Sequence, residues 1–231
     1  MKYTYEMSRE IKRLLGGDVD AFQNFFMMTA NETYFHLKMV IPGEDEIERM
    51  MVKVYKSLYF RIGRLERPED TVNWYNETLY ALITDWINVN CKKQLIDEEN
   101  GKYANRYHLR EYLYFEPEAV LTEAETAKIA GAYLTQLNPV HALTGLAYFY
   151  DSLSETAMDE LLQVDANVIR ERVKYILNLI EDDCKAYSKE NRIEIQDIDI
   201  HLILLAYVLI YKDTYLPNPV EVYNRVVDEV N

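Results

Sequence analysis

Apolar residues recur every three or four positions along most of the chain, and this spacing is the feature that most constrains its fold. From residue 47 to residue 62 they fall on one face of a helix, as Ile47, Met50, Met51, Val54, Tyr55, Leu58 and Ile62. The pattern returns after residue 70, with Trp74, Thr78, Leu79, Leu82, Ile83, Trp86 and Ile87. Stripes this wide must be covered by other helices. Because no credible pair of strands is present, the sequence predicts an all-α protein built as helical bundles.

Residues that begin and end helices support this interpretation. The counts of glycine (7) and proline (6) are low, which favours long uninterrupted elements. Side chains that cap helix N-termini stand before the apolar patterns at Asp18, Asn138, Ser154 and Asp165. The segment "LPNP" near residue 217 separates a strongly apolar helix from a last, short one.

Changes in pattern divide the chain into four parts. Residues 1–93 are predicted to form a helical bundle, and residues 94–120 a charged linker with a short helix near 106–114. Residues 121–192 are predicted to form a helix-turn-helix domain, followed by a helical extension over 193–231. The first helix of that extension is apolar on nearly every side, so it must be buried. We expect the extension to pack on the preceding domain, the alternative being a surface for a partner.

The acidic composition limits what the chain can bind. Its formal net charge is −14, and none of its four parts is basic. Residues 1–93 hold 13 basic and 14 acidic side chains, whereas residues 193–231 hold 2 and 7. Contacts to phosphate need lysine and arginine, so this balance disfavours unspecific binding of nucleic acid.

Signals for catalysis, metal binding and membranes are absent from the sequence. Its four histidines are scattered, and no nucleophile, nucleotide or metal motif is present, so we expect no enzyme, no cofactor and no metal ion. Cys91 and Cys184 lie far apart without metal spacing, which is typical of a reducing compartment. The longest apolar run, residues 200–211, is too short to span a bilayer, and no secretory signal opens the chain. We therefore expect a cytoplasmic protein without a membrane partner.

Residues 153–177 have the outline of a helix-turn-helix, the arrangement that places a helix in the DNA major groove. Ala157, Met158, Leu161 and Leu162 form the inner face of the first helix, and Val173, Ile176, Leu177 and Ile180 that of the second. The outer face of the second helix then carries Asn167, Arg170, Glu171, Lys174 and Asn178. By itself the pattern fits an ordinary helical hairpin equally well, and its turn lacks the glycine often found there.

Two segments taken together resemble bacterial RNA polymerase sigma factors of the extracytoplasmic-function type. The first is similar to the conserved region 2 of that family, at Gly17, Asp18, Ala21, Phe22, Tyr55, Trp74 and Asp85. The second is similar to region 4, at Leu137, Asn138, Leu153, Ser154, Leu162, Val164, Ile169 and Arg172. Their order and spacing fit over residues 10–190.

The resemblance implies a protein that binds core RNA polymerase and directs promoter recognition, with an anti-sigma factor or another regulator as a further partner. It implies major-groove contacts from the region 4 helix by Asn167, Arg170, Arg172 and Lys174. It implies opening of promoter DNA and capture of a base by Trp74, Tyr75, Tyr80, Lys92 and Lys93. It implies polymerase contacts by Glu48, Arg49, Val52, Lys53 and Lys56.

The sequence departs from the family pattern where DNA should be bound. The positions aligned with the family's repeated arginines and an asparagine are Glu77, Tyr80, Ala81 and Asn88, and no basic residue stands between Arg67 and Lys92. Arg49 and Val52 replace the aspartate and glutamine that the family favours in the polymerase-contacting helix. Tryptophans at helical spacing are also more typical of a core than of a stacking site. A sigma-derived regulatory protein that has lost promoter binding therefore remains the alternative.

Overall fold

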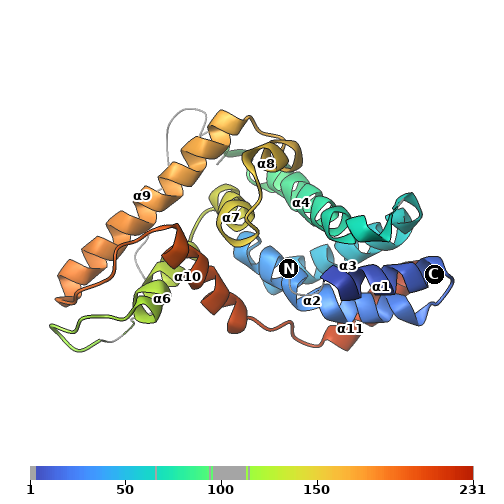
Figure 1. Ribbon diagram of the computed structural model, residues 1–231, viewed down its shortest axis with the longest axis horizontal. Helices are drawn as coiled ribbons and strands as arrows, with labels where there is room; N and C mark the ends of the chain where they lie inside the picture. The colour runs from blue at the N-terminus through green and yellow to red at the C-terminus, as the bar shows by residue number, and fades with distance from the viewer. Residues whose placement is uncertain (1–3, 66, 94, 96–112, 114, 231) are drawn as a thin grey trace. The chain divides into compact units, whose positions relative to one another are not determined.

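A computed structural model of the protein describes residues 4–65, 67–93, 95, 113 and 115–230 (Figure 1). Over these residues the fold is all-α, with ten α-helices and no strand, as the apolar spacing predicts. None of the helices in this part of the chain combines the length and apolar character that crossing a membrane requires. Most of the linker predicted for residues 94–120, including nearly all of its short helix, lies outside the described residues.

The helices group into two compact units whose boundaries differ from the predicted ones. The first unit holds the chain up to Trp86 together with everything from Thr214 onward, and the second holds residues 87–213. The first boundary falls inside α4 (Thr71–Asn90), before the predicted end of the bundle at residue 93. The extension is divided between the units, because its apolar helix belongs to the second unit and its last helix to the first.

The first unit is a bundle of α1 (Thr4–Leu15), α2 (Asp20–Val40), α3 (Glu44–Arg61), most of α4, and α11 (Pro219–Val230). Helix α2 packs against both α1 and α3, and α11 packs mainly against α3. Figure 1 shows α11, coloured red, among the blue helices from the other end of the chain. The core is rich in large side chains that are fully buried, among them Phe25, Phe26, Tyr34, Phe35, Tyr55, Tyr75 and Tyr80. The apolar stripe predicted on α3 is buried from Ile47 to Leu58.

Four hydroxyl groups pair inside this aromatic core. The Thr33 hydroxyl lies 2.9 Å from the Tyr55 hydroxyl and 2.7 Å from the Tyr75 hydroxyl. The Thr29 hydroxyl lies 2.8 Å from the same Tyr55 oxygen. Burial raises the pKa of Tyr55, so its hydroxyl stays protonated and available to donate. Each of these four hydroxyls thus has a partner, which lets tyrosine and threonine occupy the centre of the bundle.

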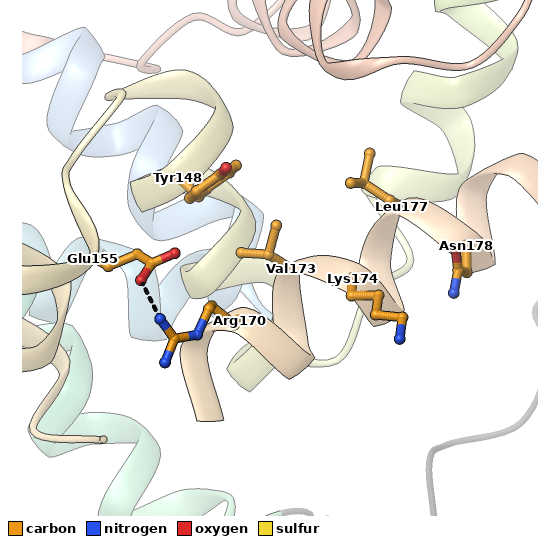
Figure 2. Close-up of a pocket in the computed structure, with 7 residues that line it drawn as sticks. All are labelled: Tyr148, Glu155, Arg170, Val173, Lys174, Leu177 and Asn178. Atoms are coloured by element: carbon orange, nitrogen blue, oxygen red, sulfur yellow. Dashed lines mark hydrogen bonds and ion pairs between the residues drawn. The ribbon is translucent and has the colours of Figure 1, made fainter. Parts of the chain in front are cut away.

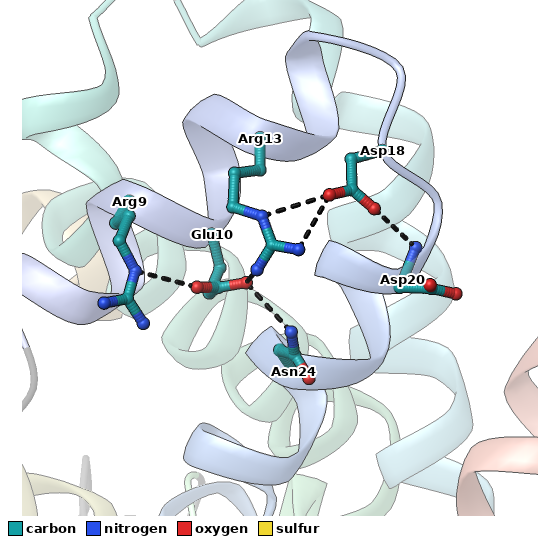
Figure 3. A network of polar contacts seen from close by, with 6 residues as sticks. All are labelled: Arg9, Glu10, Arg13, Asp18, Asp20 and Asn24. Carbon is teal, nitrogen blue, oxygen red and sulfur yellow. Dashed lines mark hydrogen bonds and ion pairs between the residues drawn. The ribbon is translucent and has the colours of Figure 1, made fainter.

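A buried carboxylate ties α1 to the start of α2 (Figure 3). Glu10, with 1% of its surface exposed, accepts hydrogen bonds from Arg9 (2.9 Å), Arg13 (2.5 Å) and Asn24 (3.1 Å). Arg13 also pairs with Asp18 at 2.7 Å. The predicted N-cap at Asp18 is wrong, because Val19 holds the N-cap position of α2 and its side chain makes no capping hydrogen bond. The Asp18 carboxylate instead accepts a hydrogen bond from the Asp20 backbone N–H at 3.2 Å.

The second unit contains α6 (Glu123–Leu134), α7 (Pro139–Gly145), the π-helical turn η3 (Leu146–Tyr150), α8 (Glu155–Leu162), α9 (Ala166–Asn191) and α10 (Ile200–Lys212). Helices α6, α7 and α8 all pack on α9, and α10 packs on α6 and η3. The predicted caps are confirmed here, because Asn138, Ser154 and Asp165 each accept a backbone hydrogen bond at the start of α7, α8 and α9. Helix α10 thus packs on the preceding domain, but only Leu202, Ile203, Ala206 and Tyr207 are buried, so the expected burial on nearly every side is not found. Helix α11 packs on the first unit instead.

Candidate functional site

The helix-turn-helix outline corresponds to α8 and the first half of α9. Helix α8 ends at Leu162, and the next residue, Gln163, has a φ of 55°, the left-handed conformation usually taken by glycine. Asp165 then caps α9 by accepting a hydrogen bond from the Asn167 backbone N–H at 2.7 Å. Gln163 therefore adopts the backbone conformation that the tight turn needs, although this turn lacks the glycine often found there.

Three of the four predicted DNA-contacting residues share the exposed side of α9. Asn167, Arg170 and Lys174 are exposed and three or four residues apart, so they line one face of the helix. Arg172 instead has 6% of its surface exposed and lies on the buried side with Ile169 and Ile176. The burial of Arg172 is predictable from the sequence, because residue 172 follows Ile169 and precedes Ile176 at the spacing of the apolar stripe.

The exposed side of α9 borders a small pocket (Figure 2). The pocket has a volume of about 170 Å³ and is lined by Tyr148, Glu155, Arg170, Val173, Lys174, Leu177 and Asn178. Arg170 donates hydrogen bonds to Glu155 at 3.1 Å and to the Asn167 side chain at 2.5 Å. Exposed ion pairs of this kind contribute only about 0–1 kcal/mol to stability. A phosphate or base edge can therefore replace Glu155 as the partner of Arg170 at small cost.

The aromatic residues predicted to capture a base are mostly inside the bundle. Tyr75 and Tyr80 are 0% exposed, and the Tyr75 hydroxyl belongs to the buried cluster around Thr33. Trp74 is half-buried, with its ring centroid 6.2 Å from that of Phe25. Stacking of a base on Tyr75 or Tyr80 thus requires the helices of the first unit to separate. Lys92 and Lys93, predicted for the same role, are exposed just beyond the end of α4.

The residues predicted to contact polymerase lie on α3, and α11 covers part of them. Glu48, Val52 and Lys56 are spaced by four residues and share one face of α3. Glu48 forms an ion pair with Arg225, and Lys56 forms one with Glu229 at 2.6 Å. The hydrogen bond from Lys56 and its positive charge hold the pKa of Glu229 below its usual value. Arg49 and Lys53 are exposed beside this face, and Arg49 pairs with Glu46 of its own helix.

The packing of α11 on α3 is the feature that the sequence did not predict. The spacing of Val222 and Val226 in the last helix predicts one buried face. It does not say which surface that face covers, because the partner helix is more than 150 residues away in the chain.

Similarity to known proteins adds no further assignment to these surfaces. No protein-family model matches the chain, and neither a curated protein nor a solved structure matches it.

Proposed function

We propose that the protein is a divergent sigma factor that binds core RNA polymerase and directs promoter recognition. The observation that carries this proposal is the exposed set Asn167, Arg170 and Lys174 at the start of α9, directly after a tight turn. In helix-turn-helix proteins, the N-terminal residues of the second helix contact base edges. The resemblance of the two segments to sigma regions 2 and 4 supports the same function.

The side chains of this set suit sequence-specific contacts. Arginine binds the O6 and N7 atoms of guanine with two hydrogen bonds, and the asparagine amide binds adenine in the same way. Lys174, one turn after Arg170, is placed to neutralise a phosphate. The net charge of −14 opposes DNA binding by the protein alone. Binding energy from the polymerase therefore has to bring α9 to the promoter.

The polymerase contact is assigned to α3, through Glu48, Arg49, Val52, Lys53 and Lys56. This assignment rests on the resemblance to region 2 and on the exposure of Arg49 and Lys53. Base capture by the aromatic residues of α4 would follow only after the first unit opens, since Tyr75 and Tyr80 are in its core.

The proposal is tested by run-off transcription. Purified protein is combined with core RNA polymerase from its own organism and with fragmented genomic DNA, and the transcripts are sequenced. We expect initiation at a defined set of promoters that core polymerase alone does not use. If no promoter gives a transcript above the level of core polymerase, the proposal is wrong.

A second candidate is a sigma-derived regulatory protein that binds a partner but not promoter DNA. It is favoured by the burial of Arg172 and by the pairing of Arg170 with Glu155. It is also favoured by the lack of any basic residue between Arg67 and Lys92. The two functions differ in the salt dependence of DNA binding by the polymerase complex. In a plot of the logarithm of the DNA-binding constant against the logarithm of the salt concentration, each phosphate contact made by this protein steepens the slope by about 0.9. The second function leaves the slope of core polymerase unchanged.

A further inference from the structure

The C-terminal helix α11 lies along α3 with a matching order of charges. Arg225 pairs with Glu48, and Glu229 pairs with Lys56 at 2.6 Å. Because Glu48 precedes Lys56 and Arg225 precedes Glu229, the two helices run in the same direction along the contact. At one end of the contact a positive side chain of α11 meets a negative one of α3, and at the other end a negative side chain of α11 meets a positive one of α3. The contact therefore has a defined direction and register.

Apolar side chains hold α11 against the rest of the bundle. Val222 and Val226 are 2% and 0% exposed, so one side of the helix is fully covered. The ring centroid of Tyr223 lies 5.3 Å from that of Phe26 and 6.3 Å from that of Phe22, both on α2. Helix α11 is thus a packed part of the first unit.

The covered face of α3 is the one assigned to a partner. Glu48, Val52 and Lys56 make up three of the five residues proposed to contact polymerase, and they share the face on which α11 forms its ion pairs. With α11 in place, Glu48 and Lys56 already have partners of opposite charge. A second protein that uses these two side chains must compete with Arg225 and Glu229 for them, and it gains the whole of this face only when α11 leaves.

The way α11 is joined to the rest of the unit permits such a departure. The segment before it is held at Asn31, whose side chain bonds to the backbone of Thr214 (3.0 Å) and Leu216 (2.9 Å). Between this anchor and the helix, Pro217 and Asn218 are exposed. The helix has 12 residues, a length at which an isolated helix is marginal in water, so its stability comes from packing on α3 and α2. Local unfolding of α11 therefore costs the contacts of its own apolar face and not those among the other helices of the bundle.

We propose that α11 is an autoinhibitory cover, which occludes the polymerase-binding face of α3 and is displaced when core RNA polymerase binds. This inference rests on the proposed sigma-factor function. The apparent affinity for polymerase is then reduced by the fraction of molecules in which α3 is covered. A change that releases α11 raises this affinity, although it lies outside the polymerase-binding set.

The test uses the full-length chain with substitutions confined to α11. Val226→Asp puts a charge at a 0% exposed position and releases the helix, whereas Val220→Asp makes the same change at a 57% exposed position and serves as the matched control. A second variant, Arg225→Ala with Glu229→Ala, removes both ion pairs and leaves the apolar contacts intact. Hydrogen exchange of residues 219–230 reports release, and equilibrium titration with core polymerase reports affinity.

We expect Val226→Asp to speed exchange in α11 and to bind core polymerase about tenfold or more tightly than wild type. The double alanine variant should show a smaller gain of a few-fold, since both of its ion pairs are exposed. Val220→Asp should match wild type in both measurements. If Val226→Asp disrupts the whole bundle, the double alanine variant decides the question, because its side chains are outside the core.

Two other results are distinguishable. Faster exchange in α11 with an affinity equal to that of wild type would overturn the autoinhibitory role and leave the sigma-factor function standing. Unchanged exchange in both variants would also overturn it, because α11 would then not be releasable. If no form of the protein binds core polymerase although α11 is released, the proposed function is wrong, and the autoinhibitory role falls with it.

Discussion

The Asn31 side chain accepts a hydrogen bond from the backbone N–H of Leu216, 2.9 Å away and 185 residues further along the chain. The same amide donates to the Thr214 carbonyl at 3.0 Å. One asparagine on α2 thus satisfies two backbone groups of the segment that leads to α11. This pairing fixes the point at which the chain returns to the first unit.

Asn31→Ala is expected to weaken the attachment of residues 214–216 to α2. It removes the two hydrogen bonds that Asn31 makes to the backbone, and Thr214 is only 7% exposed, so the free energy of unfolding should fall by about 1–3 kcal/mol. Hydrogen exchange should accelerate at residues 214–216. Asn73→Ala, at an exposed position on α4, is the control and should stay within about 0.5 kcal/mol of wild type. Equal urea midpoints for the two variants would contradict the anchoring role of Asn31.

Glu10 makes the stability of the first unit sensitive to acid. Burial alone would raise its pKa, but hydrogen bonds from Asn24 and Arg9 and the charges of Arg13 and Arg9 bring it below its ordinary value of 4.5. A carboxylate with a lowered folded-state pKa stabilises the protein above the unfolded pKa, and that stabilisation is lost as pH falls through the folded value.

Glu10→Gln should therefore lower the free energy of unfolding at pH 7 by about 1–3 kcal/mol, because the arginines lose a charged acceptor. It should also weaken the pH dependence, so that the two proteins become more alike below pH 4.5. Urea unfolding of both proteins at pH 7 and at mildly acidic pH checks this expectation. A difference between them that stays constant over this pH range would show that the charge of Glu10 contributes nothing.

Gly145 and Tyr207 are in close contact in the second unit. A methyl group at Gly145 would overlap the Tyr207 hydroxyl, which is buried and has no hydrogen-bond partner within the described part of the chain. Gly145→Ala alone should therefore destabilise the protein by about 1–3 kcal/mol. Tyr207→Phe alone should be neutral or slightly stabilising, since it removes a desolvated hydroxyl.

The double variant should recover most of the stability lost in Gly145→Ala, because the overlapping atom is gone. A double-mutant cycle from urea unfolding measures this coupling. Strict additivity of the two substitutions would show that the hydroxyl is not the obstacle at this position.

Arg170 and Arg172 are expected to respond differently to alanine. Arg170 is exposed, so Arg170→Ala, alone or with Lys174→Ala, should reduce promoter-specific transcription at least about tenfold while the free energy of unfolding changes by less than about 0.5 kcal/mol. Arg172 is 6% exposed, so Arg172→Ala should lower stability by about 1–3 kcal/mol through lost packing and polar contacts.

Lys189→Ala, near the other end of α9, is the control for loss of charge and should leave transcription unchanged. Run-off assays and urea unfolding of the four variants separate the two roles. If Arg170→Ala and Lys189→Ala transcribe equally well, α9 does not read the promoter.

Local features of the fold could be predicted from the sequence, whereas long-range contacts could not. The stripe from Ile47 to Leu58 and the caps at Asn138, Ser154 and Asp165 depend on neighbours within a few residues. The position of α11 depends on α3, and an amphipathic pattern does not name its partner.

The candidate site was predictable in part for the same reason. Asn167, Arg170 and Lys174 are exposed as their spacing predicts. Arg172, Tyr75 and Tyr80 were assigned from the family resemblance, although their spacing already places them on the apolar stripes of α9 and α4. The hydroxyl pairing that allows Tyr75 to be buried involves Thr33 on another helix, and this contact has no local signal.

Titration of the full-length protein against core RNA polymerase from its own organism tests the central claim most directly. A fluorescent label on the protein reports binding, and polymerase already holding another sigma factor provides the competition control. The sigma-factor account predicts saturable one-to-one binding that is lost when the other sigma factor is present and that strengthens in Val226→Asp. The absence of binding in both wild type and Val226→Asp, with both proteins folded, would contradict it.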